Sequence, residues 1–341
     1  MTNETAFQLM QESFARAAAF SPSGVSDSYY ILAGDLVRFR IAGRELARRL
    51  HLPFAHLRGN RGTGKTPQLT IELWDQAETG VECPEQIGRR AQNLPDDRHV
   101  SYRFNRTSVF FDRRSKHMIG SVTSAATLSL YESGRPLHPP LAQWLNDQRV
   151  PLIHAGLVSK GGKGMLLAGA GGSGKSTTAL TCLEADYQYL SDDLLGLQLL
   201  PDGSFVGHSL YSSTYLEAGH LGRFSKLGRH AIKSLDNAED KLLVLLSEIF
   251  PARLERTGTI HVIALPRVRH QSESTFSVAP KSKALFALVP SSRNVNKRLG
   301  MADFEVLTQL VERVPCYWLD LAEDLNEIPR GVDKLLAAVK N

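Results

Sequence analysis

A glycine-rich segment carries the clearest chemistry in this chain. Residues 169–176 read Gly-Ala-Gly-Gly-Ser-Gly-Lys-Ser, a full match to the pattern G-x-x-x-x-G-K-[ST]. Small residues at this spacing allow a tight loop whose backbone N–H groups bind phosphate oxygens. Lys175 can reach the outer phosphates, and the hydroxyl of Ser176 can bind Mg²⁺. We therefore predict a nucleotide-binding loop that consists of Gly169, Ala170, Gly171, Gly172, Ser173, Gly174, Lys175, Ser176 and Thr177.

A pair of carboxylates follows this loop. Asp192 and Asp193 come 17 and 18 residues after Lys175, which leaves room for one short helix, one turn and one neighbouring strand. Both carboxylates would then lie at the C-terminal end of a strand, where open α/β sheets bind ligands. One carboxylate can bind Mg²⁺, and the other can accept a proton from an attacking hydroxyl. The alternative is a solvated acidic turn, but the nearby loop favours catalysis.

The flanking sequence predicts the elements that such a loop needs. Residues 164–168 form a short apolar run typical of a buried strand, and residues 176–183 continue as a helix whose N-terminus faces the phosphates. A second match to the pattern occurs at residues 59–66, but Pro67 follows it and residues 69–74 alternate as a strand. Because no helix begins there, we interpret this second match, which includes Lys65, as a connecting loop.

Three features together resemble the catalytic domain of the HPr kinase/phosphorylase family. They are Ile153-His154-Ala155-Gly156, the glycine-rich loop, and Ser191-Asp192-Asp193. The resemblance implies a mixed α/β fold, with a P-loop-containing, phosphoenolpyruvate carboxykinase-like core. It also implies a site in which Lys175 neutralises charge on the phosphates, while Ser176 and Asp193 hold Mg²⁺. In this interpretation Asp192 accepts the proton of the acceptor hydroxyl, and His154 assists it.

The resemblance implies an ATP- and Mg²⁺-dependent kinase that phosphorylates a hydroxyl, here a serine of a protein or peptide. The chain departs from the family pattern, because the family's Gly-Lys-Ser-Glu is Gly-Lys-Ser-Thr here and no Leu-Glu-Ile-Arg-Gly segment follows. The alternatives are a small-molecule hydroxyl kinase of the same fold, and a nucleotide-binding ATPase or regulatory protein without transfer to an acceptor. Among later cations, Lys233, Lys241 and Arg253 are candidates to clamp phosphate.

The composition, 42% hydrophobic and 22% charged, is that of an ordinary globular protein. A net charge of +5 does not argue for a nucleic-acid partner, and we predict none. The three cysteines, Cys83, Cys182 and Cys316, lie far apart and have no metal-site spacing. Such an odd, sparse count is typical of a reducing compartment and not of a disulfide framework. No basic leader and no run of about eighteen apolar residues is present. We expect a cytoplasmic protein without membrane contact and leave a homo-oligomer open.

The proline-rich stretch at residues 134–140 predicts a boundary between two parts of the chain. Residues 1–135 contain consecutive short strand patterns, so we expect a β-rich, mostly antiparallel region that selects the acceptor or completes the fold. Residues 136–341 would form the ATP-binding catalytic domain. Two further expectations are a strand over residues 127–131 and a buried helix over residues 240–246.

Overall fold

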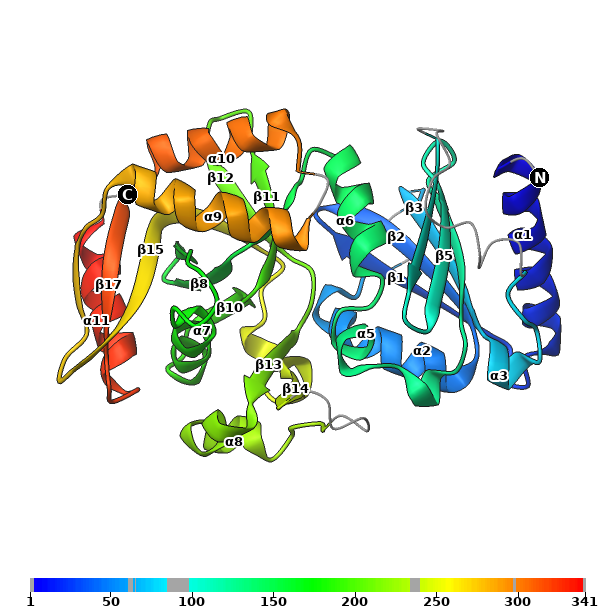
Figure 1. The fold of residues 1–341 in the computed structure, drawn as a ribbon, viewed down its shortest axis with the longest axis horizontal. Helices are drawn as coiled ribbons and strands as arrows, with labels where there is room; N and C mark the ends of the chain where they lie inside the picture. The colour runs from blue at the N-terminus through cyan, green and yellow to red at the C-terminus, as the bar shows by residue number, and fades with distance from the viewer. Residues whose placement is uncertain are drawn as a thin grey trace. The chain divides into compact units, whose positions relative to one another are not determined.

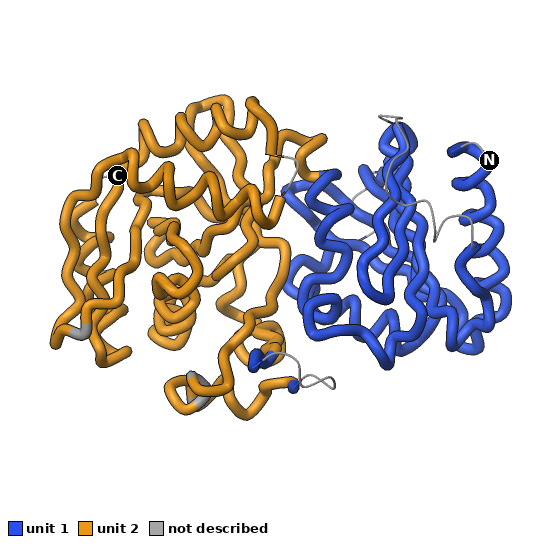
Figure 2. The backbone as a smooth tube through the Cα atoms, in the orientation of Figure 1, with its two compact units in different colours: residues 1–144, 233–242 blue, residues 145–232, 243–341 orange. Residues whose placement is uncertain are grey.

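The computed structural model describes residues 3–60, 64, 66–84, 98–233, 240–296 and 299–339. It comprises two compact units, shown in Figure 2: residues 1–144 with 233–242, and residues 145–232 with 243–341. The units divide inside helix α6 (His138–Asp147), and the domain boundary after residue 135 remains a prediction. Both units combine helices with β-sheets, so the fold class is mixed α/β, as predicted.

The first unit contains a six-stranded sheet, of which Figure 1 labels β1, β2, β3 and β5. The strand order is β1-β2-β3-β6-β5-β4. The outer pairs are antiparallel, as expected, but β2-β3 and β3-β6 at the centre are parallel. The strands are β1 (Val25–Leu32), β2 (Asp35–Ala42), β3 (Leu69–Asp75), β4 (His99–Phe104), β5 (Thr107–Asp112) and β6 (His117–Val122). Strand β3 follows the second glycine-rich match, as predicted, although residues 61–63 and Lys65 lie outside the described residues.

Helix α1 (Asn3–Phe20) packs one face on this sheet. Met10 and Phe14 are buried there against Trp74 and other apolar side chains, which accounts for the apolar periodicity of this segment. The remaining helical elements of the unit are α2 (Arg44–His51), η1 (Leu52–Leu57), α3 (Gln76–Thr79), η3 (Ala125–Thr127) and α5 (Leu130–Gly134).

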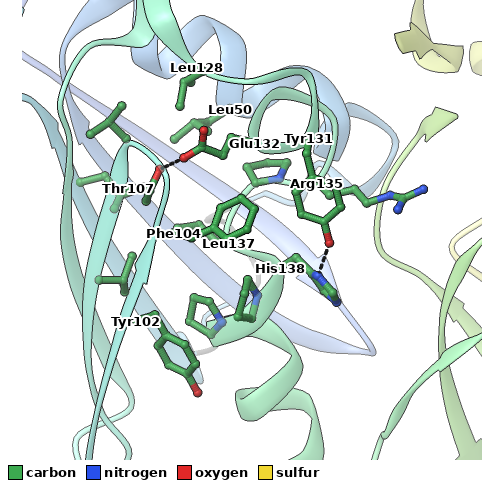
Figure 3. Close-up of a pocket in the computed structure, with 16 residues that line it drawn as sticks. Leu50, Tyr102, Phe104, Thr107, Leu128, Tyr131, Glu132, Arg135, Leu137 and His138 are labelled. Atoms are coloured by element: carbon green, nitrogen blue, oxygen red, sulfur yellow. Dashed lines mark hydrogen bonds between the residues drawn. The ribbon is translucent and has the colours of Figure 1, made fainter. Parts of the chain in front are cut away.

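The prediction of a strand over residues 127–131 is wrong, because this segment contains the end of η3 and the start of α5. Ser129 and Glu132 form a capping box, in which each side chain binds the other's backbone N–H. Figure 3 shows Glu132 also accepting a hydrogen bond from Thr107, 2.8 Å, and Tyr131 bonded to His138, 2.6 Å. The cavity between them measures about 30 Å³, which accommodates water only, so we assign it no ligand.

The second unit is built on a nine-stranded sheet in the order β10-β8-β9-β15-β12-β11-β7, with β17 beside β15 and β16 beside β17. The long strand β15 is parallel to both β9 and β17 and lies at the centre of the sheet. The strands are β7 (Leu152–His154), β8 (Gly156–Lys160), β9 (Lys163–Leu167), β10 (Gln188–Ser191), β11 (Leu194–Leu199), β12 (Phe205–Ser209), β15 (Thr257–Gln271), β16 (Thr275–Val278) and β17 (Cys316–Ala322).

Helices cover both faces of this sheet, and each face has its own apolar core. Helices α7 (Lys175–Glu184) and α11 (Glu327–Ala338) pack on one face around Leu180, Val262 and Leu335. Helices α9 (Lys281–Val295) and α10 (Met301–Arg313) pack on the other around Leu166, Leu288 and Leu310. These two layers of helices bury β9 and β15 on both faces. In a sheet covered in this way, a ligand can bind only beyond the ends of the strands.

A smaller lobe contains a two-stranded sheet of β13 (Ser213–Glu217) and β14 (Lys241–Leu245). The prediction of a buried helix over residues 240–246 is therefore wrong. A short, continuous apolar run has no period that distinguishes a buried helix from a buried strand, and here pairing with β13 makes it a strand. Short helices complete the lobe: η4 (Ala218–Arg223), α8 (Ser225–Gly228), η5 (Leu246–Glu248) and η6 (Pro251–Arg253). Among the described residues, no helix is both long and apolar enough to cross a membrane.

Candidate active site

The glycine-rich loop connects β9 to α7, as predicted. Gly172 and Gly174 have φ angles of 76° and 102°, in the left-handed region that favours glycine. At Gly174 a Cβ atom would also lie 2.5 Å from Leu321 Cδ1, so the loop is seated closely against β17. Gly174 is the N-cap of α7 and provides no side-chain cap. The first-turn N–H groups, which have no acceptor within the helix, are therefore available to an anion.

Lys175 is buried at the start of α7, where only 6% of its surface is exposed. Its Nζ donates hydrogen bonds to the carbonyl oxygens of Gly169, 2.7 Å, and Ala170, 3.1 Å. Burial lowers the pKa of the Lys175 ammonium, and the negative charges of Asp193 and Asp192 oppose this shift. The ammonium thus lies within electrostatic range of both carboxylates, which links the loop to the acidic pair.

The two carboxylates have different surroundings. Asp192 is 3% exposed, and both of its oxygens accept hydrogen bonds from hydroxyls: Oδ1 from Tyr189, 2.7 Å, and Oδ2 from Thr214, 2.8 Å. The Asp193 side chain is 20% exposed, and its Oδ1 lies 2.6 Å from Nε2 of His154. Asp192 is therefore an enclosed carboxylate, whereas Asp193 is partly open to solvent.

His154 reaches Asp193 through the pairing of β7 with β11, in which His154 lies opposite Leu194. The Ala155 N–H donates to the backbone oxygen of Asp193, 3.0 Å, and the His154 N–H donates to Ser292 Oγ on α9, 3.0 Å. The chain pairs on both sides of Ala155, as β7 before it and β8 after it. This break allows His154 to face the acidic pair while β8 continues beside the loop strand.

The sheet order corrects one expectation about the acidic pair. Strand β10, which ends at the pair, is not the neighbour of β9, because β8 lies between them. Since β8 is antiparallel to both, β9 and β10 run in the same direction and end at the same edge of the sheet. The backbones of β8 and the acidic pair approach each other closely at Gly156, where a Cβ atom would lie 3.3 Å from the Asp192 Cα.

The structure therefore brings Lys175, His154, Asp192 and Asp193 to one edge of the sheet. Ser176 and Thr177 are half-buried in the first turn of α7. Gly169 is buried, whereas Ala170, Gly171 and Gly172 are exposed. Ser173 Oγ is buried without a hydrogen-bond partner among the described residues, and Ser173 lies against Gly169.

Of the three candidate phosphate clamps, the structure places Arg253 away from these residues. Arg253 forms an ion pair with Asp186, at the end of α7 remote from the loop. Lys233 and Lys241 are exposed and belong to the segment grouped with the first unit. Within the described part of the chain, no three His, Cys, Asp or Glu side chains form a group that could hold a metal ion.

Two residues that contact the acidic pair were not anticipated. Tyr189 lies in β10 and Thr214 in β13, and the sequence carries no motif that marks either of them. In a regular strand, residues 189 and 192 would face opposite sides, so periodicity alone predicts no contact between them. Thr214 comes 22 residues after Asp192, in a segment with little periodicity.

Comparisons with known proteins support the resemblance. No protein-family model matches the chain. Over 111 residues it is 29% identical to the HPr kinase/phosphorylase of Treponema pallidum, both in strain Nichols and in a second strain, of subspecies pallidum. The match covers 31% of this chain and 35% of each relative, so it spans about a third of the curated relatives' length.

Among solved structures, the Hpr(Ser) kinase/phosphatase from Coxiella burnetii aligns with 54% of this chain and 95% of its own. The identity is 12% and the TM-score 0.29. The sequence match to the two Treponema proteins confirms that the chain is similar to the HPr kinase/phosphorylase family.

Proposed function

We propose that this protein is an ATP- and Mg²⁺-dependent kinase that transfers the γ-phosphoryl group to a hydroxyl. One observation carries the proposal. Lys175 of the loop helix, the carboxylates that follow β10, and His154 of β7 converge at one sheet edge. A phosphate-binding cation, a partly open carboxylate and an adjacent histidine are what phosphoryl transfer to a hydroxyl needs.

The loop is suited to a nucleotide phosphate chain. The N-terminus of α7 has backbone N–H groups without a side-chain cap, and Lys175 is held beside them by two loop carbonyls. These carbonyls satisfy the ammonium only partly, since it has three protons to donate. Ser176, Asp192 and Asp193 offer hard oxygen ligands, which fit Mg²⁺ bound together with nucleotide. Bound in this way, the metal would neutralise charge on the phosphates.

The contacts of the acidic pair favour an exchange of the roles that the family resemblance implies. Asp193 is the more exposed carboxylate and forms an ion pair with His154. We therefore assign to Asp193 the role of accepting the proton of the attacking hydroxyl. His154 orients this carboxylate. Asp192 is enclosed, and its oxygens accept from two hydroxyls. A carboxylate has about four lone-pair positions, so two remain for a cation, and we assign Asp192 to magnesium with Ser176.

The acceptor in this proposal is a serine of a protein or peptide. The sequence similarity to HPr kinase/phosphorylase supports this class. A small-molecule hydroxyl is the alternative acceptor, and the same arrangement of Lys175, Asp192 and Asp193 would serve it. The two acceptors differ in the surface that must recognise them and not in the chemistry of transfer.

Turnover of γ-labelled ATP by Lys175→Ala tests the proposal. We expect this variant to lose turnover while keeping the fold, because the lysine acts on phosphate charge. Lys65→Ala is a control matched by sequence motif and should retain wild-type turnover. Equal losses in both variants would contradict the assignment of the loop. Turnover unaffected by protein, peptide or small-molecule acceptors would instead indicate an ATPase.

A further inference from the structure

The enclosed carboxylate of Asp192 is fixed from two sides by hydroxyl groups of different elements. Tyr189 and Thr214 are themselves buried, with exposed fractions of 1% and 0%. Each donates to a different oxygen of Asp192, at 2.7 and 2.8 Å. We propose that Tyr189 and Thr214 are positioning residues that set the orientation of Asp192 for the magnesium–nucleotide complex. This inference rests on the proposed function and assigns a role to two residues outside the loop and the acidic pair.

The contact between Tyr189 and Asp192 depends on an irregularity in β10. Tyr189 lies opposite Val158 of β8, and Ser191 lies opposite Leu157, so two steps along β10 match one step along β8. This is a β-bulge, which adds a residue and turns the following side chain. Without it, residues 189 and 192 would point to opposite faces. The register shift and the bend that begins at Asp192, just beyond the end of β10, together free this side chain from strand alternation.

Ser191 fixes the turn that follows the bulge. Its hydroxyl donates to the carbonyl oxygen of Leu194, 2.8 Å, and accepts from the Asp193 N–H, 3.0 Å. The backbone of the acidic pair is therefore held independently of the two hydroxyls on Asp192. Removing those hydroxyls should change the carboxylate orientation of Asp192 more than the course of the chain.

Thr214 contributes the second hydrogen bond from β13. Its hydroxyl has a single proton, and donation to Asp192 uses that proton. With one donor on each oxygen, a rotation of the carboxylate about χ2 weakens both bonds, unless it is a half-turn that merely exchanges the two equivalent oxygens. Partners that orient a metal ligand in this way typically affect metal affinity or activity by about 10–100-fold when they are removed.

The chain provides a matched control for each hydroxyl. Tyr187 is also fully buried, and its hydroxyl donates to a carboxylate, Asp333, at 2.5 Å. Asp333 is half-exposed on α11 and bonded to Lys160, so it has no part in the candidate site. Thr181 is 5% exposed, and its hydroxyl donates to the Thr177 carbonyl oxygen at 2.8 Å.

The test measures binding of a fluorescent, non-hydrolysable ATP analogue during Mg²⁺ titration, with thermal unfolding alongside. In Tyr189→Phe and Thr214→Val we expect the Mg²⁺ concentration for half-maximal analogue binding to rise about 10–100-fold. Thr214→Ser keeps the hydroxyl and should restore most of the wild-type value. Tyr187→Phe and Thr181→Val remove comparable buried hydrogen bonds and should leave the Mg²⁺ requirement unchanged.

Two failures are distinguishable. A wild-type protein that does not bind the analogue with Mg²⁺ would refute the proposed function itself. Normal wild-type binding, with Tyr189→Phe and Thr214→Val requiring the same Mg²⁺ concentration, would overturn the positioning role alone. Lower melting temperatures in these two variants at an unchanged Mg²⁺ requirement would reduce their role to packing and would also overturn it.

Discussion

Substitution of Gly174 by alanine should destabilise the protein through two separable effects. The residue has φ 102° and ψ 9°, and an L-residue in this left-handed conformation costs about 1–2 kcal/mol. Its Cβ would also lie 2.5 Å from Leu321 Cδ1, and overpacking of this kind costs about 1–3 kcal/mol. We therefore expect Gly174→Ala to lower the free energy of unfolding by about 2–5 kcal/mol.

Gly172→Ala separates the two effects. Gly172 also has a positive φ, 76°, but a Cβ atom there meets nothing within 4 Å. Only the backbone cost of about 1–2 kcal/mol should therefore remain. Urea unfolding followed by circular dichroism measures both free energies. The difference between the variants, about 1–3 kcal/mol, isolates the contact with Leu321.

A double-mutant cycle then tests the contact directly. Leu321→Ala alone creates a cavity and should cost about 2–5 kcal/mol, since Leu321 is 3% exposed. In this background the cost of Gly174→Ala should fall to that of Gly172→Ala, which gives a coupling energy of about 1–3 kcal/mol. Additive costs, or equal costs for the two glycine variants, would show that the loop does not pack on Leu321 of β17.

Two further outcomes follow from the same contacts. Gly156→Ala should displace the acidic pair by a few tenths of an ångström, because the new Cβ would lie 3.3 Å from the Asp192 Cα. The Mg²⁺ concentration required for nucleotide-analogue binding should then rise, while the melting temperature should change little. Burial lowers the pKa of His208 to about 4, so the unfolded chain binds more protons between pH 6.5 and 4, and stability should fall as the pH drops through this range. The loss is at most about 3 kcal/mol, and urea unfolding of His208→Gln, which can still donate to Gln198, should show a weaker pH dependence.

The course of the loop was predictable, because the types and spacing of its residues match a pattern that binds phosphate. Gly172 and Gly174 are required by positive φ angles, and Lys175 and Ser176 follow in the order that the motif predicts. The apolar strand before the loop and the helix after it were likewise predictable, since hydrophobic periodicity reflects burial. His154 was different, because an apolar strand with one histidine has many explanations, and the family resemblance alone singled it out.

Features that depend on tertiary context were not predictable in this way. The apolar run at residues 241–245 is a strand because β13 provides its partner, and nothing local distinguishes it from a buried helix. The insertion of β8 between β9 and β10 follows from sheet pairing and not from spacing along the chain. The hydrogen bonds of Tyr189 and Thr214 to Asp192 require a bulge and a distant strand, respectively, and neither leaves a local signal.

We propose that this sheet edge transfers a phosphoryl group to a hydroxyl, with Asp193 as the proton acceptor. The most direct measurement is transfer of labelled γ-phosphate from ATP to an HPr protein and to an arrayed serine-peptide library by wild type, Asp193→Asn and Asp192→Asn. Asp193→Asn should reduce transfer by about 10²–10⁴-fold with little change in nucleotide affinity, whereas excess Mg²⁺ should partly rescue Asp192→Asn. Wild-type transfer by Asp193→Asn, or rescue of that variant by metal, would show that Asp193 is not the proton acceptor.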